Sequence, residues 1–309
     1  MLKLFQVSRL SKSALLILLA ATATAAVFYP RARLLAIAAA GRSSVCPLSA
    51  ALKSHGNLRD QIRYKDQILA ASRLVEEDPK GFELWETPQG RYWVPKGSRW
   101  VLPFNLAERQ RKIYGSGDQA VQSGDIVLDC GANVGTDTRA WVEIGAKLVV
   151  AIEPAPENIE CLRRNFKNEI ASGQVILIEK GVWDKEDTLT FRVDPKNSAA
   201  DSFVISHEGS ASVAHIPVTT IDRIVDDLHL ARVDYIKMDV EGAEQRALEG
   251  ARRTIARDRP KLTLATEHRL DDAETLIAAV NRIRPGYRME CGPCAEEKGH
   301  IRPDVLYFR

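Results

Sequence analysis

Three charged residues alternate in the stretch DYIKMDVEGAE, residues 234–244, which otherwise is typical of a buried strand that leads into a helix. Side chains of a strand point alternately to its two faces, so Lys237, Asp239 and Glu241 share one face. An unpaired charge is costly to bury in a sheet, so these side chains must pair or reach a cleft. We therefore predict a catalytic group whose carboxylates reach the cleft, while Lys237, one pleat deeper, neutralises them.

A structural role is the alternative for the same stretch. Glu241 and Glu244 would then act only at the start of the following helix, where the macrodipole favours anions. Lys237 and Asp239 would form an ion pair without a catalytic role. Both interpretations stay open for Glu244. For Asp239 and Glu241 we favour the functional one, because strand-end carboxylates beside a cofactor commonly act in binding or catalysis.

A second candidate site is the sequence VLDCGANVG, residues 127–135, at the end of another apolar run. A dinucleotide fingerprint would require glycine at position 133, where Asn133 stands, so a nicotinamide dehydrogenase is disfavoured. The carboxylate of Asp129 would repel a pyrophosphate. It would suit a cationic cofactor such as S-adenosylmethionine, which carries an ammonium and a sulfonium. Gly131 and Gly135 would let the backbone approach this ligand and the next helix.

The ends of the next two strands extend this site. Glu153 could accept hydrogen bonds from both hydroxyls of a ribose, and an adenine ring could lie against the stretch 181–183. Structural alternatives exist, since Asp129 could be a turn carboxylate, Glu153 a loop residue and Trp183 a core residue. Their positions at three successive strand ends favour a nucleoside cofactor. The predicted cofactor-binding residues are Asp129, Gly131, Ala132, Asn133, Gly135, Glu153, Pro154, Gly181, Val182 and Trp183.

These residues are positioned by short apolar strands that alternate with helix patterns from residue 125 onwards. This alternation predicts an α/β fold with a mainly parallel sheet covered on both faces, whose ligands bind beyond the C-terminal strand ends. The expected strands are DIVLDCG, KLVVAIEP, QVILIEKGVW, VDYIKMDVEG and KLTLATEH, with TLTFRVD and SVAHIPVTTID as an antiparallel excursion and YRMEC and VLYFR as a closing pair. The expected helices cover residues 136–145, 156–170, 244–257 and 271–283.

The N-terminal part has a different character. Residues 1–30 combine a basic start with the uncharged segment 13–30, which fits a membrane anchor, a cleaved signal peptide or a buried helix. The bulky residues that follow favour an uncleaved single-pass anchor. We expect the following domain on the cytosolic side of the membrane, because S-adenosylmethionine, the cofactor suggested above, is a cytosolic metabolite.

Two further segments complete the predicted organisation. Residues 31–115 are expected to form a cap with a helix over 50–77 and a hairpin over 82–97. Residues 116–309 form the main domain.

Composition excludes several classes of function. The formal net charge of +2 gives no field that would recruit nucleic acid. Five cysteines, an odd number spread through the chain, do not resemble a disulfide framework and fit a reducing compartment. The tetrapeptide from Cys291 to Cys294 resembles a redox motif but lies far from the start of a βαβ unit, and with only His300 nearby it lacks the ligands for zinc.

Together, VLDCGANVG, AIEP and TTIDRIVDDLHLARVDYIKMDVEGAEQRALEGA resemble the FkbM-type S-adenosylmethionine-dependent methyltransferases, over roughly residues 120–309. The resemblance implies a Rossmann-like class I methyltransferase fold with a seven-stranded sheet and one reversed edge strand, here VLYFR, plus a small N-terminal extension. It implies O-methylation of a sugar or natural-product-like acceptor. The motif assigns Asp129, Gly131, Asn133, Gly135 and Glu153 to the cofactor, and it places Asp239 and Glu241 at the transferred methyl group.

Methyl transfer to a hydroxyl needs alignment of the two reactants and removal of a proton. The candidate bases are Asp239, Glu241, Glu267 and His268, of which we favour a carboxylate. No metal site is predicted, although a divalent cation on Asp239, Glu241 and Glu267 stays open. The alternative function is a catalytically silent binding module at the membrane, and the costly carboxylates argue against it.

Overall fold

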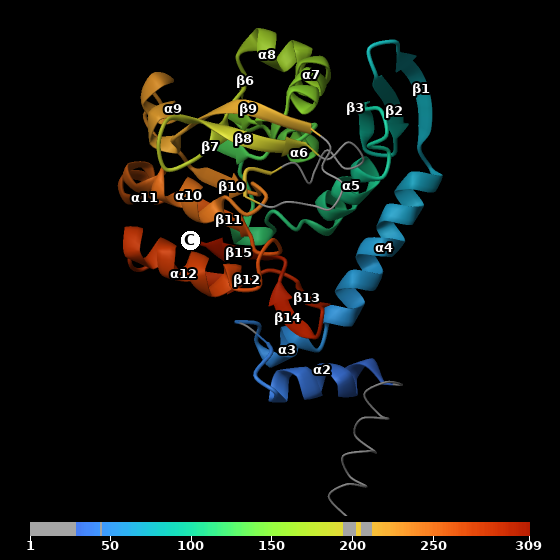
Figure 1. The fold of residues 1–309 in the computed structure, drawn as a ribbon, viewed down its shortest axis with the longest axis vertical. Helices are drawn as coiled ribbons and strands as arrows, with labels where there is room; N and C mark the ends of the chain where they lie inside the picture. The colour runs from blue at the N-terminus through green and yellow to red at the C-terminus, as the bar shows by residue number, and fades with distance from the viewer. Residues whose placement is uncertain (1–28, 44, 194–201, 205–211) are drawn as a thin grey trace, which may run out of the picture.

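The computed structural model describes residues 29–43, 45–193, 202–204 and 212–309. Within these residues, the central sheet has seven strands in the order β12-β15-β11-β10-β4-β5-β6 (Figure 1). Neighbouring strands are parallel except at β15, which is antiparallel to both its neighbours. This confirms the predicted fold class. The reversed strand lies second from the edge, because β12 pairs with its outer side. The strands are β4 (Ile126–Cys130), β5 (Leu148–Ile152), β6 (Val175–Ile178), β10 (Tyr235–Met238), β11 (Lys261–Ala265), β12 (Met289–Cys291) and β15 (Val305–Phe308).

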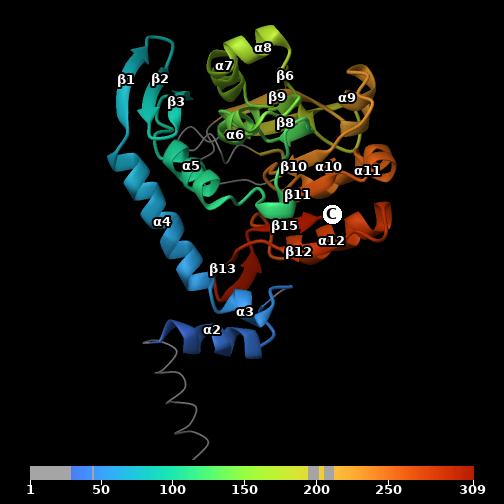
Figure 2. The ribbon, with the colours of Figure 1, turned by 180° about the vertical axis from the view of Figure 1, so that it is seen from behind.

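Helices cover both faces of this sheet (Figures 1 and 2). One face packs on α9 (Ile221–Asp227), α10 (Glu244–Glu249), α11 (Arg252–Asp258) and α12 (Asp272–Ile283), and the other on α6 (Thr136–Ile144), α7 (Pro156–Asn165) and α8 (Lys167–Ser172). Successive side chains of a strand point to opposite faces of the sheet. Ile236 therefore packs in the core beside α9–α12, and Tyr235 packs in the core beside α6–α8. Two predicted helices are interrupted, at Phe166 and at Gly250.

The expected excursion forms a small sheet of its own. Strands β8 (Asp187–Val193) and β9 (Ser212–Thr219) pair in antiparallel register, as predicted. The predicted strand QVILIEKGVW is divided, because its end forms β7 (Gly181–Val182), which pairs with β9 instead of continuing β6. This small sheet therefore lies beside the C-terminal end of the central sheet, where it can contribute to a site.

The cap packs against the main domain through a helix and a small sheet. It contains α2 (Pro30–Ala39), α3 (Leu48–Ala51), α4 (Ser54–Ala70), β1 (Arg73–Asp78), β2 (Phe82–Thr87), β3 (Gly90–Pro95) and α5 (Val101–Arg111), followed by the 3₁₀ turn η1 (Gly117–Gln119). The helix predicted over 50–77 ends at Ala70, because the next residues pair with the predicted hairpin as a third strand. Asn165 of α7 hydrogen-bonds the backbone of Trp93 through both its amide atoms, which holds the hairpin on the main domain.

The cysteines differ from the sequence-based expectation. A disulfide joins Cys46 to Cys294, 248 positions later, although the cysteine pattern predicted none. It links the segment before α3 to β13 (Cys294–Glu297), which forms a hairpin with β14 (His300–Pro303). Cys291 carries a free thiol, so the tetrapeptide does not form an internal redox pair. The spacing of cysteines could not reveal this bond, because it depends on how α2 and α3 pack on that hairpin.

The predicted membrane localisation requires correction. The proposed anchor, residues 13–30, lies outside the described residues except for Tyr29 and Pro30. Across the residues that the structure describes, no helix combines the length and the apolar character needed to cross a bilayer. The first described helix, α2, has 10 residues. It therefore spans about 15 Å, half the thickness of a hydrocarbon core. The predicted single-pass anchor with a cytosolic catalytic domain is therefore corrected: the described residues hold no helix that would support this localisation.

Candidate active site

A cavity of about 780 Å³ opens at the C-terminal ends of the central strands. This volume lies in the range of roughly 300–1,000 Å³ that is typical of small-molecule sites. Strand ends form its floor through Gly131, Glu153, Asp239 and Glu267. The excursion contributes Gly181, Val182, Phe191 and Phe203 to one wall, and the cap contributes Lys65, Trp100, Phe104, Asn105 and Glu108 to another. The cavity thus brings together three parts of the chain that are distant in sequence.

The turn after β4 depends on its glycines. Gly131 has a φ of +80°, and a Cβ there would lie 1.8 Å from the carbonyl oxygen of Asp239. A Cβ at Gly135 would overlap the ring of Phe166 at 2.2 Å. Only glycine therefore permits these close approaches. The turn exposes Gly131, Ala132 and Asn133 to the cavity, so these predicted cofactor residues do meet a ligand-sized space.

Asp129 lies beneath this turn rather than in the cavity lining. Its side chain is completely buried, and Thr138 donates a hydrogen bond of 2.6 Å to its Oδ2. Lys237 places its Nζ 3.5 Å from Asp129 Oδ1 and donates a 2.7 Å hydrogen bond to the carbonyl of Gly131. The carboxylate at the cavity surface is instead Asp137, in the first turn of α6. Burial raises the pKa of Asp137 to about 7.

Glu153 is held at the cavity by three N–H donors. The amide of Asn133 donates to Oε2 at 2.8 Å, and the amide of Ala155 and the side chain of Asn158 donate to Oε1 at 3.0 and 3.3 Å. Burial raises the pKa of Glu153, while these donors oppose the shift. The carboxylate is therefore fixed in orientation at the end of β5, as a ribose-binding group requires.

Trp183 lies outside the cavity, in contrast to its neighbours. Pro154, Gly181 and Val182 line the cavity, but Trp183 lines a separate surface depression, where Arg246 stacks over its ring. The aromatic surface of the cavity comes from Phe191 and Phe203, whose ring centroids lie 4.6 Å apart. The sequence analysis missed these two residues, because both lie on the excursion, away from any strand end of the central sheet.

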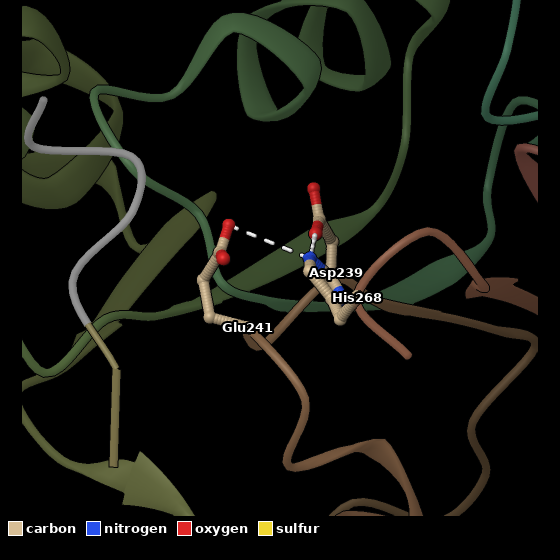
Figure 3. A group of neighbouring side chains, drawn as sticks. All are labelled: Asp239, Glu241 and His268. Carbon is tan, nitrogen blue, oxygen red and sulfur yellow. Dashed lines mark ion pairs between the residues drawn. The ribbon is translucent and has the colours of Figure 1, made fainter. Parts of the chain in front are cut away.

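Three side chains of the cavity lining converge beyond β10 and β11 (Figure 3). His268 Nε2 lies 3.5 Å from Asp239 Oδ1 and 3.5 Å from Glu241 Oε1. Asp239 also accepts a 2.7 Å hydrogen bond from Tyr114 on its Oδ2. Burial alone would lower the pKa of His268, but the carboxylates of Glu244 and Glu241 raise it well above its ordinary value. Burial opposes ionisation of Asp239, yet Lys237 and His268 hold the pKa of Asp239 below its usual range.

Two further carboxyl groups line the cavity: Glu267, a candidate base predicted from the sequence, and Glu108, which has no clear signal in the sequence. Glu108 enters the cavity from α5 of the cap, and burial together with Glu267 raises its pKa well above the usual range. Partial desolvation and Asp239 likewise raise the pKa of Glu267, which faces the open side of the cavity. The cavity lining is therefore rich in carboxyl groups, and those that ionise favour cationic ligands.

The family described as the Methyltransferase FkbM domain matches residues 129–289, from Asp129 in β4 to Met289 in β12. The chain is 28% identical over 132 residues to "Hexuronic acid methyltransferase AglP" of Haloferax volcanii, a match that covers 43% of this chain and 52% of the relative. The chain thus spans about half the length of that relative.

Two further similarities were found. The chain is 22% identical over 179 residues to "2-O-methyltransferase NoeI" of Sinorhizobium fredii, covering 53% of this chain and 72% of that protein. The crystal structure of Methyltransferase FkbM from Methylobacillus flagellatus KT aligns with a TM-score of 0.47 and 20% identity, over 83% of this chain and 60% of that chain.

Proposed function

The chain belongs to the FkbM methyltransferase family, and from that premise we propose that it transfers a methyl group from S-adenosylmethionine to a hydroxyl of a saccharide acceptor. The observation that carries this proposal is the shared cavity. Glu153 and Asp137 line it beside the glycine turn, which we call the first end, and Asp239, Glu241 and His268 line it as a second group, which we call the second end. A donor and an acceptor bound at these two ends would meet within one enclosed space.

The residues of the first end fit S-adenosylmethionine. The glycine turn leaves room beside the backbone, and the acidic surface around Asp137 suits the ammonium and sulfonium charges. Glu153 would accept hydrogen bonds from the ribose, and Val182 and Phe203 would face the adenine. Asp129 and Lys237 would act from below, by holding the turn. Trp183 is left out of this assignment because it lies outside the cavity.

The second end would orient the acceptor and accept its proton. When bound, the cofactor supplies an electrophilic methyl group on sulfur. The acceptor oxygen forms the new O–CH₃ bond as the S–CH₃ bond breaks, so S-adenosylhomocysteine leaves and the hydroxyl proton passes to the protein. A carboxylate of Asp239 or Glu241 is the better acceptor, because the raised pKa values of His268 and Glu267 keep those two groups protonated.

Two observations support a saccharide as the acceptor. Both relatives are named for methylation chemistry, one of them for a hexuronic acid. Trp100 and Phe104 of the cap line the cavity and remain 53% and 40% exposed. Aromatic faces of this kind suit the apolar C–H face of a sugar ring.

Calorimetric titration of S-adenosylmethionine into the full chain tests the proposal directly. We expect micromolar binding, a loss of at least about tenfold in affinity for Glu153→Gln, and wild-type affinity for the exposed control Glu157→Gln. Transfer of a labelled methyl group to a panel of hexoses and hexuronic acids then tests the reaction. Absence of binding by the folded protein would reject the methyltransferase and favour a silent binding module.

A further inference from the structure

The group Asp239, Glu241 and His268 has spacings longer than those of ordinary hydrogen bonds. Both carboxylate oxygens lie 3.5 Å from the same nitrogen, His268 Nε2, whereas N–H···O bonds are usually about 2.7–3.2 Å long. The three ligand atoms lie within 4.8 Å of one another. Figure 3 shows the two carboxylates on either side of the imidazole edge, each joined by a dashed line to the same ring nitrogen.

The same spacings fit the edges of a coordination polyhedron. Metal–ligand bonds to nitrogen and oxygen are about 2.0–2.2 Å long, so neighbouring ligands of a four- to six-coordinate ion lie about 3.0–3.5 Å apart. The side chain of His268 is 6% exposed, and those of Asp239 and Glu241 are each 23% exposed on the cavity side. A cation among them would thus be bound by three protein atoms and would keep open positions toward the cavity.

Glu244 provides a second and independent observation. It is 1% exposed, and its Oε1 lies 3.1 Å from His268 Nδ1, the ring nitrogen that faces away from the group. The backbone amide of Val240 donates to the same oxygen at 2.9 Å. A histidine whose outer nitrogen faces a buried, anchored carboxylate is the arrangement that orients metal-binding imidazoles.

Asp239 is oriented in a similar way. Its Oδ2 faces Tyr114 at 2.7 Å and Lys237 at 3.7 Å, which leaves Oδ1 directed at His268. The supporting contacts therefore occupy the outer atoms of two of the three residues and leave their inner atoms converging on one point.

We propose that Asp239, Glu241 and His268 bind one divalent cation, and that its open positions take two neighbouring oxygens of the acceptor. One imidazole with two carboxylates is a ligand set that suits Mn²⁺ better than Ca²⁺. The role in acceptor binding rests on the proposed methyl transfer. It narrows the acceptor to a saccharide with a vicinal diol or a hydroxyl beside a carboxylate. Glu267 lies outside this set of ligands.

Binding of Mn²⁺ to the full chain, stripped of metal beforehand and followed by electron paramagnetic resonance, tests the site without any turnover. We expect one bound ion per chain, with affinity reduced at least about tenfold in His268→Gln and in Glu241→Gln. The matched controls His55→Gln and Glu157→Gln, at exposed positions, should bind as the wild type does. Equal binding by His268→Gln, or no binding by the wild type at submillimolar Mn²⁺, overturns the site and leaves the group as a protonated imidazole between carboxylates.

A parallel titration with S-adenosylmethionine separates this proposal from the proposed function. Cofactor binding and methyl transfer that persist unchanged in a chelator reject the metal and leave the methyltransferase intact. Mn²⁺ bound at these residues without any binding of cofactor supports the site and rejects the function.

Discussion

Asp129 of β4 and Lys237 of β10 are direct cross-strand partners in the centre of the sheet, and both side chains are almost completely buried. Their charged atoms lie 3.5 Å apart, and Lys237 also reaches the carbonyl of Gly131. One ammonium thus connects the strand that begins the cofactor turn with the strand that ends in the acceptor site. Each charge offsets the desolvation cost of the other. Removing one partner should therefore destabilise the fold far more than removing both.

Substitution of Lys237 by methionine should destabilise the fold strongly. It leaves Asp129 buried without its cation, and breaking a buried pair in this way costs about 3–5 kcal/mol. The double variant Lys237→Met with Asp129→Asn should recover most of that loss. Urea unfolding of the two single variants and the double variant measures the coupling. A loss in the double variant equal to the sum of the single losses would show that the two charges are independent.

Asp137 should make stability depend on pH. Its pKa rises from 3.8 to about 7 in the folded protein, so the fold favours the protonated form. Stability should therefore fall as the pH rises from about 4 through 7. Asp137→Asn should be more stable than the wild type by about 1–3 kcal/mol at pH 8 and equal to it near pH 4. Asp137→Asn should also bind S-adenosylmethionine more weakly. Unchanged binding would instead indicate that Asp137 has only a structural role. Thermal unfolding across this pH range, with and without cofactor, provides the measurement.

The adenine-binding surface can be located by comparing two aromatic residues. Phe203→Ala should weaken S-adenosylmethionine binding by about tenfold, since stacking of a base on an aromatic ring contributes about 1–3 kcal/mol. Trp183→Ala should leave the dissociation constant within a factor of about two, because Trp183 faces the separate depression. If calorimetry showed a larger loss of affinity for Trp183→Ala than for Phe203→Ala, the adenine would be assigned to Trp183.

Trp100 should affect the acceptor but not the cofactor. Trp100→Ala removes an exposed ring from the cap wall, so KM for the saccharide should rise about tenfold while the affinity for S-adenosylmethionine is unchanged. Steady-state kinetics with each substrate varied in turn distinguishes the two effects. A change in cofactor affinity alone would place Trp100 at the donor end.

Much of the site was predictable because the pleat of a strand is regular. Alternation alone put Lys237 beneath Asp239, and the strand ends alone located Glu153 and the glycine turn. What sequence could not provide was contact between distant segments. Glu108, Trp100 and Phe203 enter the cavity from the cap and the excursion, and only packing determines that. Trp183 shows the opposite case, a residue predicted in the site that lies outside it. It directly follows Gly181 and Val182, which line the cavity, but it lines the separate depression beyond the end of β7, which pairs with β9. The pairing of β12 with β15 was predicted as the closing pair, although the resemblance placed β15 at the sheet edge, which β12 occupies instead.

The disulfide should contribute measurably to stability. Cys46→Ser should lower the free energy of unfolding by about 2–4 kcal/mol under oxidising conditions. The control Cys291→Ser should change it little, since that thiol is free. A reducing agent should bring the wild type to the level of Cys46→Ser and leave that variant unaffected. Equal stability of all forms with and without reductant would indicate that the bond does not form.

The bond between Cys46 and Cys294 also turns most of the protein into a covalent ring. A protease that cuts one peptide bond anywhere between these positions opens the ring without dividing the molecule. The fragments would migrate as a single species until the sulfur–sulfur bond is reduced. Both ends of the cavity lie within this ring, so a nicked chain would keep its donor and acceptor residues together, and its helix α3 could not be shed.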